Sequence, residues 1–320
     1  MRMILVEETG GPQQLHPTDV PEPTPKAAQV AIQVAAIGVN YIDTYHRSGA
    51  YRLPLPFTPG SEGAGVVTAL GEGVTSVQVG DKVAWSSVSG SYADVIIADV
   101  DQLALVPDDI DIRTAASVML QGLTAHYLCT SVHPVRSGEW TVVHAAAGGV
   151  GLLLTQLIKQ RGGHVIATAS TAHKQALARD NGADAVCGYE EFVELSRTLT
   201  GGLGVHAVFD GVGRDTFASS VEALRPRGTM ALFGQSSGAV EPIDPQILAQ
   251  GGSLFLTRPT LADFIATPQE YQWRTGELFR LIGDDQLTVR VGAEFPLSNA
   301  SAAHEALEGR QTTGKVLLIP

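Results

Sequence analysis

Cysteine is scarce in this chain of 320 residues, which contains only Cys129 and Cys187. The two lie far apart and form no C-x-x-C pair, so neither a disulfide scaffold nor a cysteine-rich zinc site is supported. We expect both to be small core residues of a protein in a reducing compartment, which favours the cytoplasm.

The chain also has few basic residues and no long apolar stretch. There are 21 Lys and Arg residues against 33 Asp and Glu residues, a formal net charge of −12. Affinity for nucleic acid or for an anionic membrane needs a basic face, so both partners are disfavoured. No apolar stretch approaches the length of a membrane span, and the first residues, MRMILVEETGG, lack the pattern of a signal peptide.

The most informative stretch that is present runs from Trp140 to Lys174. An apolar, β-branched run at 141–143 predicts a buried strand, and the turn AAAGGVG and a helical pattern of Leu and Ile follow it. The helix is expected to end at Gly162, before a second apolar strand at 164–169. This is the βαβ unit that binds a dinucleotide, with the pyrophosphate at the helix N-terminus.

The glycine turn departs from the usual G-x-G-x-x-G pattern at its first position. Ala146 replaces the first glycine, whereas Gly148 and Gly151 hold the positions that phosphate approach and helix packing require. A glycine turn alone could be a tight connection without a ligand, but the flanking elements favour nucleotide binding. No Lys-Ser or Lys-Thr follows the last glycine, so the turn is not an NTPase phosphate loop.

The end of the second strand distinguishes the two nicotinamide cofactors. NAD sites present a carboxylate there, which accepts hydrogen bonds from the ribose hydroxyls. This chain has TASTAHK at 168–174, with no Asp or Glu, and Ser170, Thr171 and Lys174 suit a 2′-phosphate. The alternative is that Ser170 or Thr171 only caps the next helix and Lys174 is solvated. The missing carboxylate favours NADPH.

The pattern of expected elements divides the chain into regions. Residues 1–120 contain short apolar strands broken by Pro and Gly, which is typical of a small barrel or sandwich. Helices and strands then alternate up to residue 261, which implies a parallel sheet with helices on both faces. Residues 262–320 leave this pattern. The chain is long enough for two domains with separate cores.

Several motifs together resemble one known family. They are GVNYIDTYHRSGAY at 38–51, PGSEGAGVV at 59–67, HAAAGGVG at 144–151, GVGRDTF at 211–217, FGQSSGAV at 233–240 and the C-terminal GRQTTGKVLLIP. In this combination the chain resembles the NADPH-dependent quinone oxidoreductases, the zinc-independent branch of the medium-chain dehydrogenase/reductase superfamily that includes zeta-crystallin. The resemblance covers nearly the whole chain.

The resemblance implies a fold, a reaction and a partner. The fold is α/β, with a GroES-like, barrel-type domain of residues 1–120 and 262–320 and a Rossmann domain of residues 121–261. The reaction is hydride transfer from the nicotinamide C4 of NADPH to a quinone or another conjugated carbonyl compound. The partner is a second copy, with the last Rossmann strand, residues 253–257, paired across a homodimer interface.

The resemblance also implies that the reaction is independent of a metal. Zinc-dependent relatives carry a Cys ligand where this chain has Asn40, and a His where it has Ser61, beside Glu62. Neither replacement is a good soft or imidazole ligand for zinc, so we expect no metal site.

The motifs assign residues to the site by resemblance. Asn40, Tyr45 and Tyr51 are implied to lie beside the reacting carbonyl. We expect positioning rather than proton transfer from the tyrosines, because a phenol of ordinary pKa is a poor acid at neutral pH. The implied cofactor-binding residues are Tyr41, Ile42, Asp43, Thr44, Tyr45, Tyr127, Gly148, Gly149, Val150, Gly151, Ser170, Thr171, Lys174, Tyr189, Gly211, Phe233, Gly234, Gln235, Ser236, Pro259, Thr260, Leu261 and Arg310.

Each assignment has a structural alternative. Asn40 could cap a turn, Asp43 could hold its loop through backbone hydrogen bonds, and Arg310 could be an ordinary exposed cation. His144 is expected to be a core residue of the first Rossmann strand. Two competing functions stay open. One is the reduction of enones or enoyl thioesters on the same fold, and the other is an NADPH-binding sensor or RNA-binding protein with little turnover.

Overall fold

The computed structural model describes all 320 residues, and their internal contacts divide them into two compact units. Unit 1 comprises Met1–Leu123 and Ile265–Pro320, and unit 2 comprises Thr124–Phe264. We expected the division after residues 120 and 261. Both units mix helices with a sheet, as the α/β fold class requires.

Unit 1 is built on a seven-stranded sheet in the order β14-β15-β3-β4-β5-β7, with β6 paired to β3. All its pairs are antiparallel except β14 and β15, which are parallel. A separate two-stranded sheet pairs β1 with β2. The strands of this unit are β1 (Arg2–Leu5), β2 (His16–Asp19), β3 (Gln29–Val39), β4 (Gly63–Leu70), β5 (Lys82–Trp85), β6 (Val95–Asp99), β7 (Ala104–Leu105), β14 (Val291–Pro296) and β15 (Lys315–Ile319).

One helix of unit 1, α1, has an unusual buried face. The α-helices of this unit are α1 (Tyr41–Ser48), α2 (Ile112–Tyr127), whose residues from Thr124 on belong to unit 2, α8 (Pro268–Gly283) and α9 (Ala300–Glu308), and the short 3-10 turns are η1 (Pro12–Gln14), η2 (Val100–Gln102) and η5 (Leu297–Asn299). In α1 the buried residues are Asp43, Thr44 and Arg47. Buried polar and charged groups need partners, so α1 must be held by hydrogen bonds as well as by packing.

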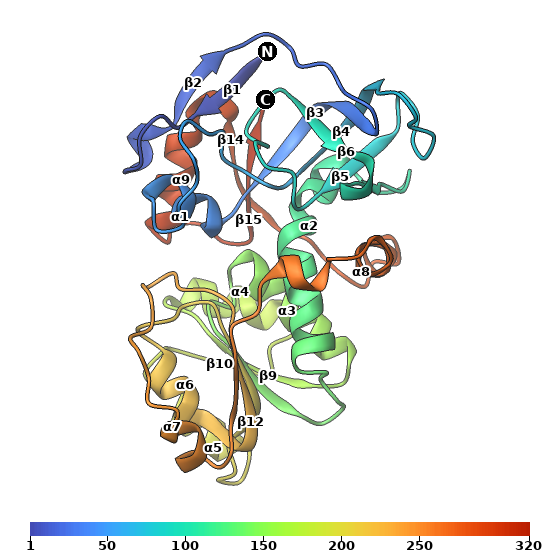
Figure 1. Cartoon of the computed structure of the whole chain (residues 1–320). Helices are drawn as coiled ribbons and strands as arrows, with labels where there is room; N and C mark the ends of the chain where they lie inside the picture. Colours follow the sequence, from blue (N-terminus) through green and yellow to red (C-terminus); the bar gives the residue numbers. More distant parts are fainter. The chain divides into compact units, whose positions relative to one another are not determined.

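Unit 2 contains a six-stranded parallel sheet in the order β10-β9-β8-β11-β12-β13. Figure 1 labels β9, β10 and β12 of this sheet. Its strands are β8 (Trp140–Val143), β9 (His164–Thr168), β10 (Ala185–Cys187), β11 (Val205–Asp210), β12 (Leu224–Leu232) and β13 (Phe255–Thr257). Its helices are α3 (Gly149–Gln160), α4 (Ala172–Asp180), α5 (Phe192–Leu199), α6 (Phe217–Ala223) and α7 (Gln246–Gln250), with a π-helical turn η3 (Leu128–Val132) and a 3-10 turn η4 (Leu261–Phe264).

The strand order of unit 2 reverses between β8 and β11. Helix α3 packs beside α4, and α5 packs beside α6, and right-handed crossovers place these pairs on opposite faces of the sheet. The central strands are therefore covered on both sides, which explains why Val142, Ile166, Val208 and Met230 are all fully buried. In sheets of this kind a ligand binds beyond the carboxyl ends of the strands where the order reverses.

The start of β13 differs from that expected from the sequence. Strand β13 begins at Phe255 rather than Ser253, because Gly252 and Ser253 take positive φ angles of 97° and 59° and form a turn. No helix in the structure is both long enough and apolar enough to span a membrane.

Helix α3 lies so close to the preceding turn that position 151 has no room for a side chain. A Cβ atom at this position would lie 2.6 Å from the Ala145 carbonyl oxygen and 2.6 Å from Ala146 Cα, both backbone atoms. We predict that Gly151→Ala lowers the free energy of unfolding by about 2 kcal/mol in urea denaturation, the usual cost of overpacking.

The matched control is Gly276→Ala, also within a helix. A Cβ atom at Gly276 would meet nothing within 4 Å, so this variant should gain up to about 1 kcal/mol from helix propensity. Equal effects of the two substitutions would contradict the steric argument.

Candidate functional site

The N-terminus of α3 offers unpaired backbone donors. Gly148 is extended (φ −79°, ψ 173°) and precedes the helix, and the first backbone bond back to it comes from Leu152 N–H at 3.0 Å. The N–H groups of Gly149, Val150 and Gly151 therefore have no acceptor within the helix. Together with the positive end of the helix dipole they favour an anion.

The residues that follow β9 in unit 2 are those predicted to bind the 2′-phosphate. Ser170 and Thr171 are exposed, and residues 168–174 carry no carboxylate. Thr171 Oγ1 accepts a hydrogen bond from Lys174 N–H at 3.3 Å, so Thr171 caps α4. The cap does not decide between a structural role for these residues and one in binding the 2′-phosphate. The Tyr189 ring stacks on that of His144, with centroids 5.8 Å apart.

The loops after β11 and β12 pack directly against each other. The N–H groups of Phe233 and Gly234 donate to the Asp210 carbonyl oxygen, at 2.9 and 3.3 Å, and Ser236 N–H donates to the Gly211 carbonyl oxygen at 3.2 Å. A Cβ atom on Gly234 would lie 2.6 Å from the Gly211 oxygen, so the contact needs glycine. The structure thus brings the predicted residues of these two loops together.

The remaining predicted cofactor-binding residues of unit 2 lie near the first and the last residues of this unit, Thr124 and Phe264. Tyr127, at the end of α2, is buried and stacks on Phe264 with centroids 4.4 Å apart. Pro259, Thr260 and Leu261 follow β13, and Thr260 Oγ1 donates to the Asp263 carboxylate at 2.9 Å.

Three predicted tyrosines of unit 1 form a group on and after α1. The ring centroids of Tyr41 and Tyr45 are 6.2 Å apart, and those of Tyr45 and Tyr51 are 5.2 Å apart. Tyr51 N–H donates to the Tyr45 carbonyl oxygen at 3.0 Å, which fixes the loop after the helix. Ile42 is half-buried on the same helix, and Arg310 lies in the exposed turn after α9 with a φ of 55°.

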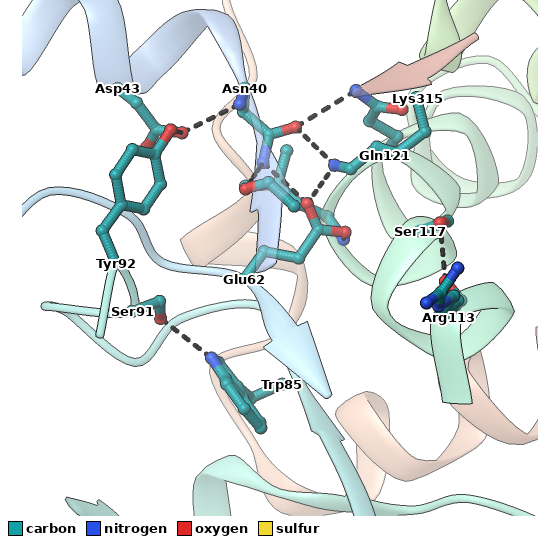
Figure 2. Close-up of polar contacts among 12 residues, drawn as sticks. Asn40, Asp43, Glu62, Trp85, Ser91, Tyr92, Arg113, Ser117, Gln121 and Lys315 are labelled. Atoms are coloured by element: carbon teal, nitrogen blue, oxygen red, sulfur yellow. Dashed lines mark hydrogen bonds and ion pairs between the residues drawn. The ribbon is translucent and has the colours of Figure 1, made fainter. Parts of the chain in front are cut away.

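Asn40, just before α1, belongs to a buried polar cluster that Figure 2 shows in detail. Its Nδ2 donates to Glu62 Oε2 at 2.6 Å and to the Gly38 carbonyl oxygen at 3.4 Å. Its Oδ1 accepts from Lys315 Nζ at 3.1 Å and from Gln121 Nε2 at 3.2 Å. Every polar site of the amide is therefore used by the protein.

Lys315 and Glu62 form a fully buried ion pair within this cluster. Their side chains are 1% and 0% exposed and are in direct contact. Burial lowers the pKa of Lys315, while the Glu62 carboxylate raises it. The second Glu62 oxygen accepts from Leu120 N–H of α2 at 2.7 Å. Both charged groups are thus paired and hydrogen-bonded, as burial requires.

A chain of hydrogen bonds joins α1 to α9. Arg47 Nη1 lies 3.2 Å from His304 Nδ1, and Tyr92 OH lies 3.0 Å from His304 Nε2 and 3.1 Å from Asp43 Oδ2. Arginine can only donate, so Nδ1 accepts, Nε2 carries the proton, and Tyr92 donates to Asp43. Burial lowers the pKa of His304 to about 3, which keeps the ring neutral. Arg47 also pairs with Glu308 through two contacts of 2.8 and 3.0 Å.

Asp43 is the one carboxyl of this region with an unpaired oxygen. Its Oδ2 accepts from Asn40 N–H at 2.8 Å as well as from Tyr92, whereas its buried Oδ1 has no partner. The structural role expected for Asp43 as an alternative is therefore present. Burial raises the pKa of Asp43 to about 7, although the hydrogen bonds and the charge of Lys315 lower it.

Most of this buried cluster was not predicted from the sequence. Tyr92, Gln121 and His304 lie in none of the motifs, and Lys315 lies in the C-terminal motif GRQTTGKVLLIP but received no role there. The one signal in the sequence was a charged residue, Lys315, at the start of the apolar run KVLLI. This signal indicates a buried lysine but does not identify Glu62 as its partner. No group of three or more His, Cys, Asp or Glu side chains in the structure could hold a metal ion.

Comparisons with known proteins agree with this architecture. The family models described as "Alcohol dehydrogenase GroES-like domain" and "Zinc-binding dehydrogenase" match residues 26–108 and 149–276. A probable quinone oxidoreductase of Schizosaccharomyces pombe is 42% identical over 320 residues, covering 99% of this chain and 96% of that protein. A 2-haloacrylate reductase of Burkholderia sp is 37% identical, covering 99% and 98%. The crystal structure of Escherichia coli quinone oxidoreductase complexed with NADPH has 40% identity and a TM-score of 0.98, covering both chains completely.

These matches, with the GroES-like sheet of unit 1 and the parallel Rossmann sheet of unit 2, define the protein as a medium-chain dehydrogenase/reductase. Its fold class and its enzymatic class, an oxidoreductase, are those expected from the sequence motifs. Within that superfamily the chain belongs to the quinone oxidoreductase family.

The raised pKa of Asp43 predicts a specific dependence of stability on pH. The unfolded carboxyl has a pKa of about 3.9, so between about pH 4 and pH 7 the unfolded chain has lost a proton that the folded chain keeps. The free energy of unfolding should therefore fall as pH rises through this window, by at most about 1.4 kcal/mol per pH unit, and level off above about pH 7.

Asp43→Asn is the matched variant, because its amide oxygen can still accept from Asn40 and Tyr92. The free energy of unfolding of both proteins is measured by urea denaturation across this pH window. With rising pH it should fall more for the wild type than for the variant. Two parallel curves would show that Asp43 ionises normally.

Proposed function

We propose that this protein reduces quinones with NADPH by hydride transfer without a metal. The observation that carries the proposal is the N-terminus of α3, where the unpaired N–H groups after Gly148 lie at the strand-order reversal of unit 2. The NADPH complex of the Escherichia coli quinone oxidoreductase, which has the same fold, supports it.

The residues of unit 2 fit NADPH in two places. The N–H groups of Gly149 to Gly151 would hold the pyrophosphate, since no side chain stands at Gly148 or Gly151 to block its approach. Ser170, Thr171 and Lys174 would hold the 2′-phosphate, because no carboxylate repels it. The other residues proposed for this site are Tyr127, Tyr189, Gly211, Phe233, Gly234, Gln235, Ser236, Pro259, Thr260 and Leu261. Bound NADPH supplies the hydride from its nicotinamide C4.

The residues of unit 1 would orient the acceptor. We propose that the hydroxyls of Tyr45 and Tyr51 position its carbonyl oxygen, and that Tyr41, Ile42, Thr44 and Arg310 complete the nicotinamide side. Asn40 would act by holding the start of α1, since its amide is already saturated by Glu62, Lys315 and Gln121. Asn40 and Ser61 offer an amide and a hydroxyl in place of thiolate and imidazole ligands, and Glu62 is paired with Lys315, which supports a mechanism without zinc.

A second candidate function is the reduction of conjugated enones or acrylates. It is favoured by the 37% identity to a 2-haloacrylate reductase over 99% of this chain. The fold and the cofactor would be unchanged, and only the acceptor would differ.

We also propose a homodimer formed through β13. This strand is the last of the six-stranded sheet and pairs only with β12, so its outer edge is open. Phe255 on this strand is 61% exposed, a large apolar side chain at an unprotected edge. Pairing with a second copy would cover both the edge and the side chain.

The cytoplasm is the proposed location. Cys129 and Cys187 are free and buried, and burial raises the pKa of the Cys187 thiol to about 11. Such thiols are typical of a reducing compartment.

The proposed reaction is tested by following NADPH and NADH oxidation separately, with a simple quinone and then a conjugated enone. NADPH consumption with the quinone is expected. If NADPH is consumed with the enone alone, the acceptor is an enone and the proposed quinone reduction is wrong. If NADPH binds but is consumed with neither acceptor, the protein is an NADPH-binding protein without this activity.

Lys174→Ala tests the cofactor preference. Removing a cation from a 2′-phosphate should raise KM for NADPH about tenfold or more, through loss of a charge-assisted hydrogen bond, and leave KM for NADH unchanged. Lys26→Ala, an exposed lysine of unit 1, is the control and should change neither value. An equal change in both KM values would contradict the role of Lys174.

Phe255→Asp tests the dimer. Light scattering after gel filtration should give a dimer for the wild type and a monomer for the variant, because two carboxylates would face each other at the strand pair. Leu203→Asp, at a similarly exposed apolar residue (63%) outside the sheet, should remain a dimer. A monomeric wild type would rule out the proposed assembly.

A further inference from the structure

His144 lies at the end of β8, immediately before the glycine turn, and is 1% exposed. Its Nδ1 is 2.8 Å from Thr168 Oγ1, at the end of β9, and its Nε2 is 2.9 Å from Ser220 Oγ, on α6. One buried ring therefore joins two strand ends and a helix.

The hydrogen bonds of this cluster have a single consistent direction. The Ser220 hydroxyl donates to Asp210 Oδ2 at 2.9 Å, so it must accept from His144. Nε2 then carries the proton, and Nδ1 accepts from the Thr168 hydroxyl. Burial lowers the pKa of His144, which favours the neutral ring that this pattern needs.

The set of Ser220, His144 and Asp210 is not a nucleophilic triad. A catalytic serine gives its proton to the histidine, whereas the Ser220 proton points to Asp210. All three side chains are buried, at 0–1% exposed. The cluster therefore holds positions rather than attacking a substrate.

The groups held by His144 support the proposed nucleotide site. Through Ser220 it orients Asp210, whose Oδ1 accepts from Val212 N–H at 2.8 Å and from Gly213 N–H at 2.9 Å. These bonds shape the loop that begins at Gly211. The Thr168 carbonyl oxygen accepts from Ala146 N–H at 3.0 Å, within the glycine turn.

Two aromatic side chains complete the surroundings of His144. Phe192 meets its ring edge-on at 4.7 Å, and Tyr189 stacks on it at 5.8 Å. Tyr189 is one of the residues proposed for the NADPH site. The ring of His144 thus contacts Tyr189, and through its hydrogen bonds it supports the glycine turn and the loop that begins at Gly211.

We propose that His144 is a positioning residue for NADPH, which sets the affinity for the nucleotide through Thr168, Ser220 and Asp210 without touching it. This inference rests on the proposed function.

The test is NADPH titration of the full-length protein, followed by NADPH fluorescence. His144→Phe keeps an aromatic ring beside Phe192 and Tyr189 and removes both hydrogen bonds. Its Kd for NADPH should rise about tenfold, the effect of about one lost hydrogen bond. The quinone KM and the turnover at saturating NADPH should stay within about twofold, a split that general destabilisation would not produce.

Ser220→Ala keeps the proposal falsifiable if His144→Phe folds poorly, and a double-mutant cycle of the two is the further test if it folds. Ser220→Ala alone should also raise Kd about tenfold, and adding it to His144→Phe should change little more, because both remove the same chain of hydrogen bonds. Ser196→Ala is the control. It removes a buried hydroxyl of unit 2 that has no hydrogen-bond partner and should leave Kd unchanged.

Three outcomes would count against the proposal, and they are distinct. Wild-type protein that fails to bind NADPH would overturn the proposed function and this inference with it. Normal wild-type binding, with Kd in both variants within about twofold of it, would overturn the inference alone. A rise in Ser196→Ala equal to that in the two variants would show that the effect is general loosening of the domain.

Discussion

The buried ion pair between Lys315 and Glu62 is the interaction on which unit 1 depends. Neither side chain is exposed to water, so each charge is neutralised only by the other and by its hydrogen bonds to Asn40 and Leu120. Removing one partner of such a pair typically costs about 3–5 kcal/mol, because the remaining charge stays buried. The start of α1, with its proposed acceptor-binding tyrosines, is held in place through this pair.

In each of the two units a buried hydrogen-bond network holds the proposed site residues in place. In unit 1 charged groups hold the start of α1, and in unit 2 the neutral ring of His144 holds two strand ends and the loop beyond Asp210. Buried hydrogen-bond networks of this kind are rigid when every member is satisfied. Asp43 Oδ1 is the exception, since it has no partner. Burial raises the pKa of this carboxyl to about 7, so its ionisation responds to pH near neutrality.

The features predictable from the sequence are those determined by residues close together in the chain. The turn before α3, the missing carboxylate after β9 and the alternation of strands and helices all lie within short windows, and the structure has them where expected. The boundary of β13 was wrong because a non-glycine residue, Ser253, takes a positive φ. The cluster around Asn40 was missed because Lys315 and Glu62 are 253 residues apart, a pairing that no local pattern encodes.

The place of β15 in the sheet has a consequence for how the protein is made. This strand follows unit 2 in the chain, and it lies between β14 and β3 in the sheet of unit 1. When the whole of unit 2 has been synthesised, the first 123 residues still lack this inner strand and the ammonium that neutralises Glu62. Domains fold as units as they emerge from the ribosome, so the nucleotide-binding unit can fold before unit 1, whose sheet is incomplete until β15 has been added.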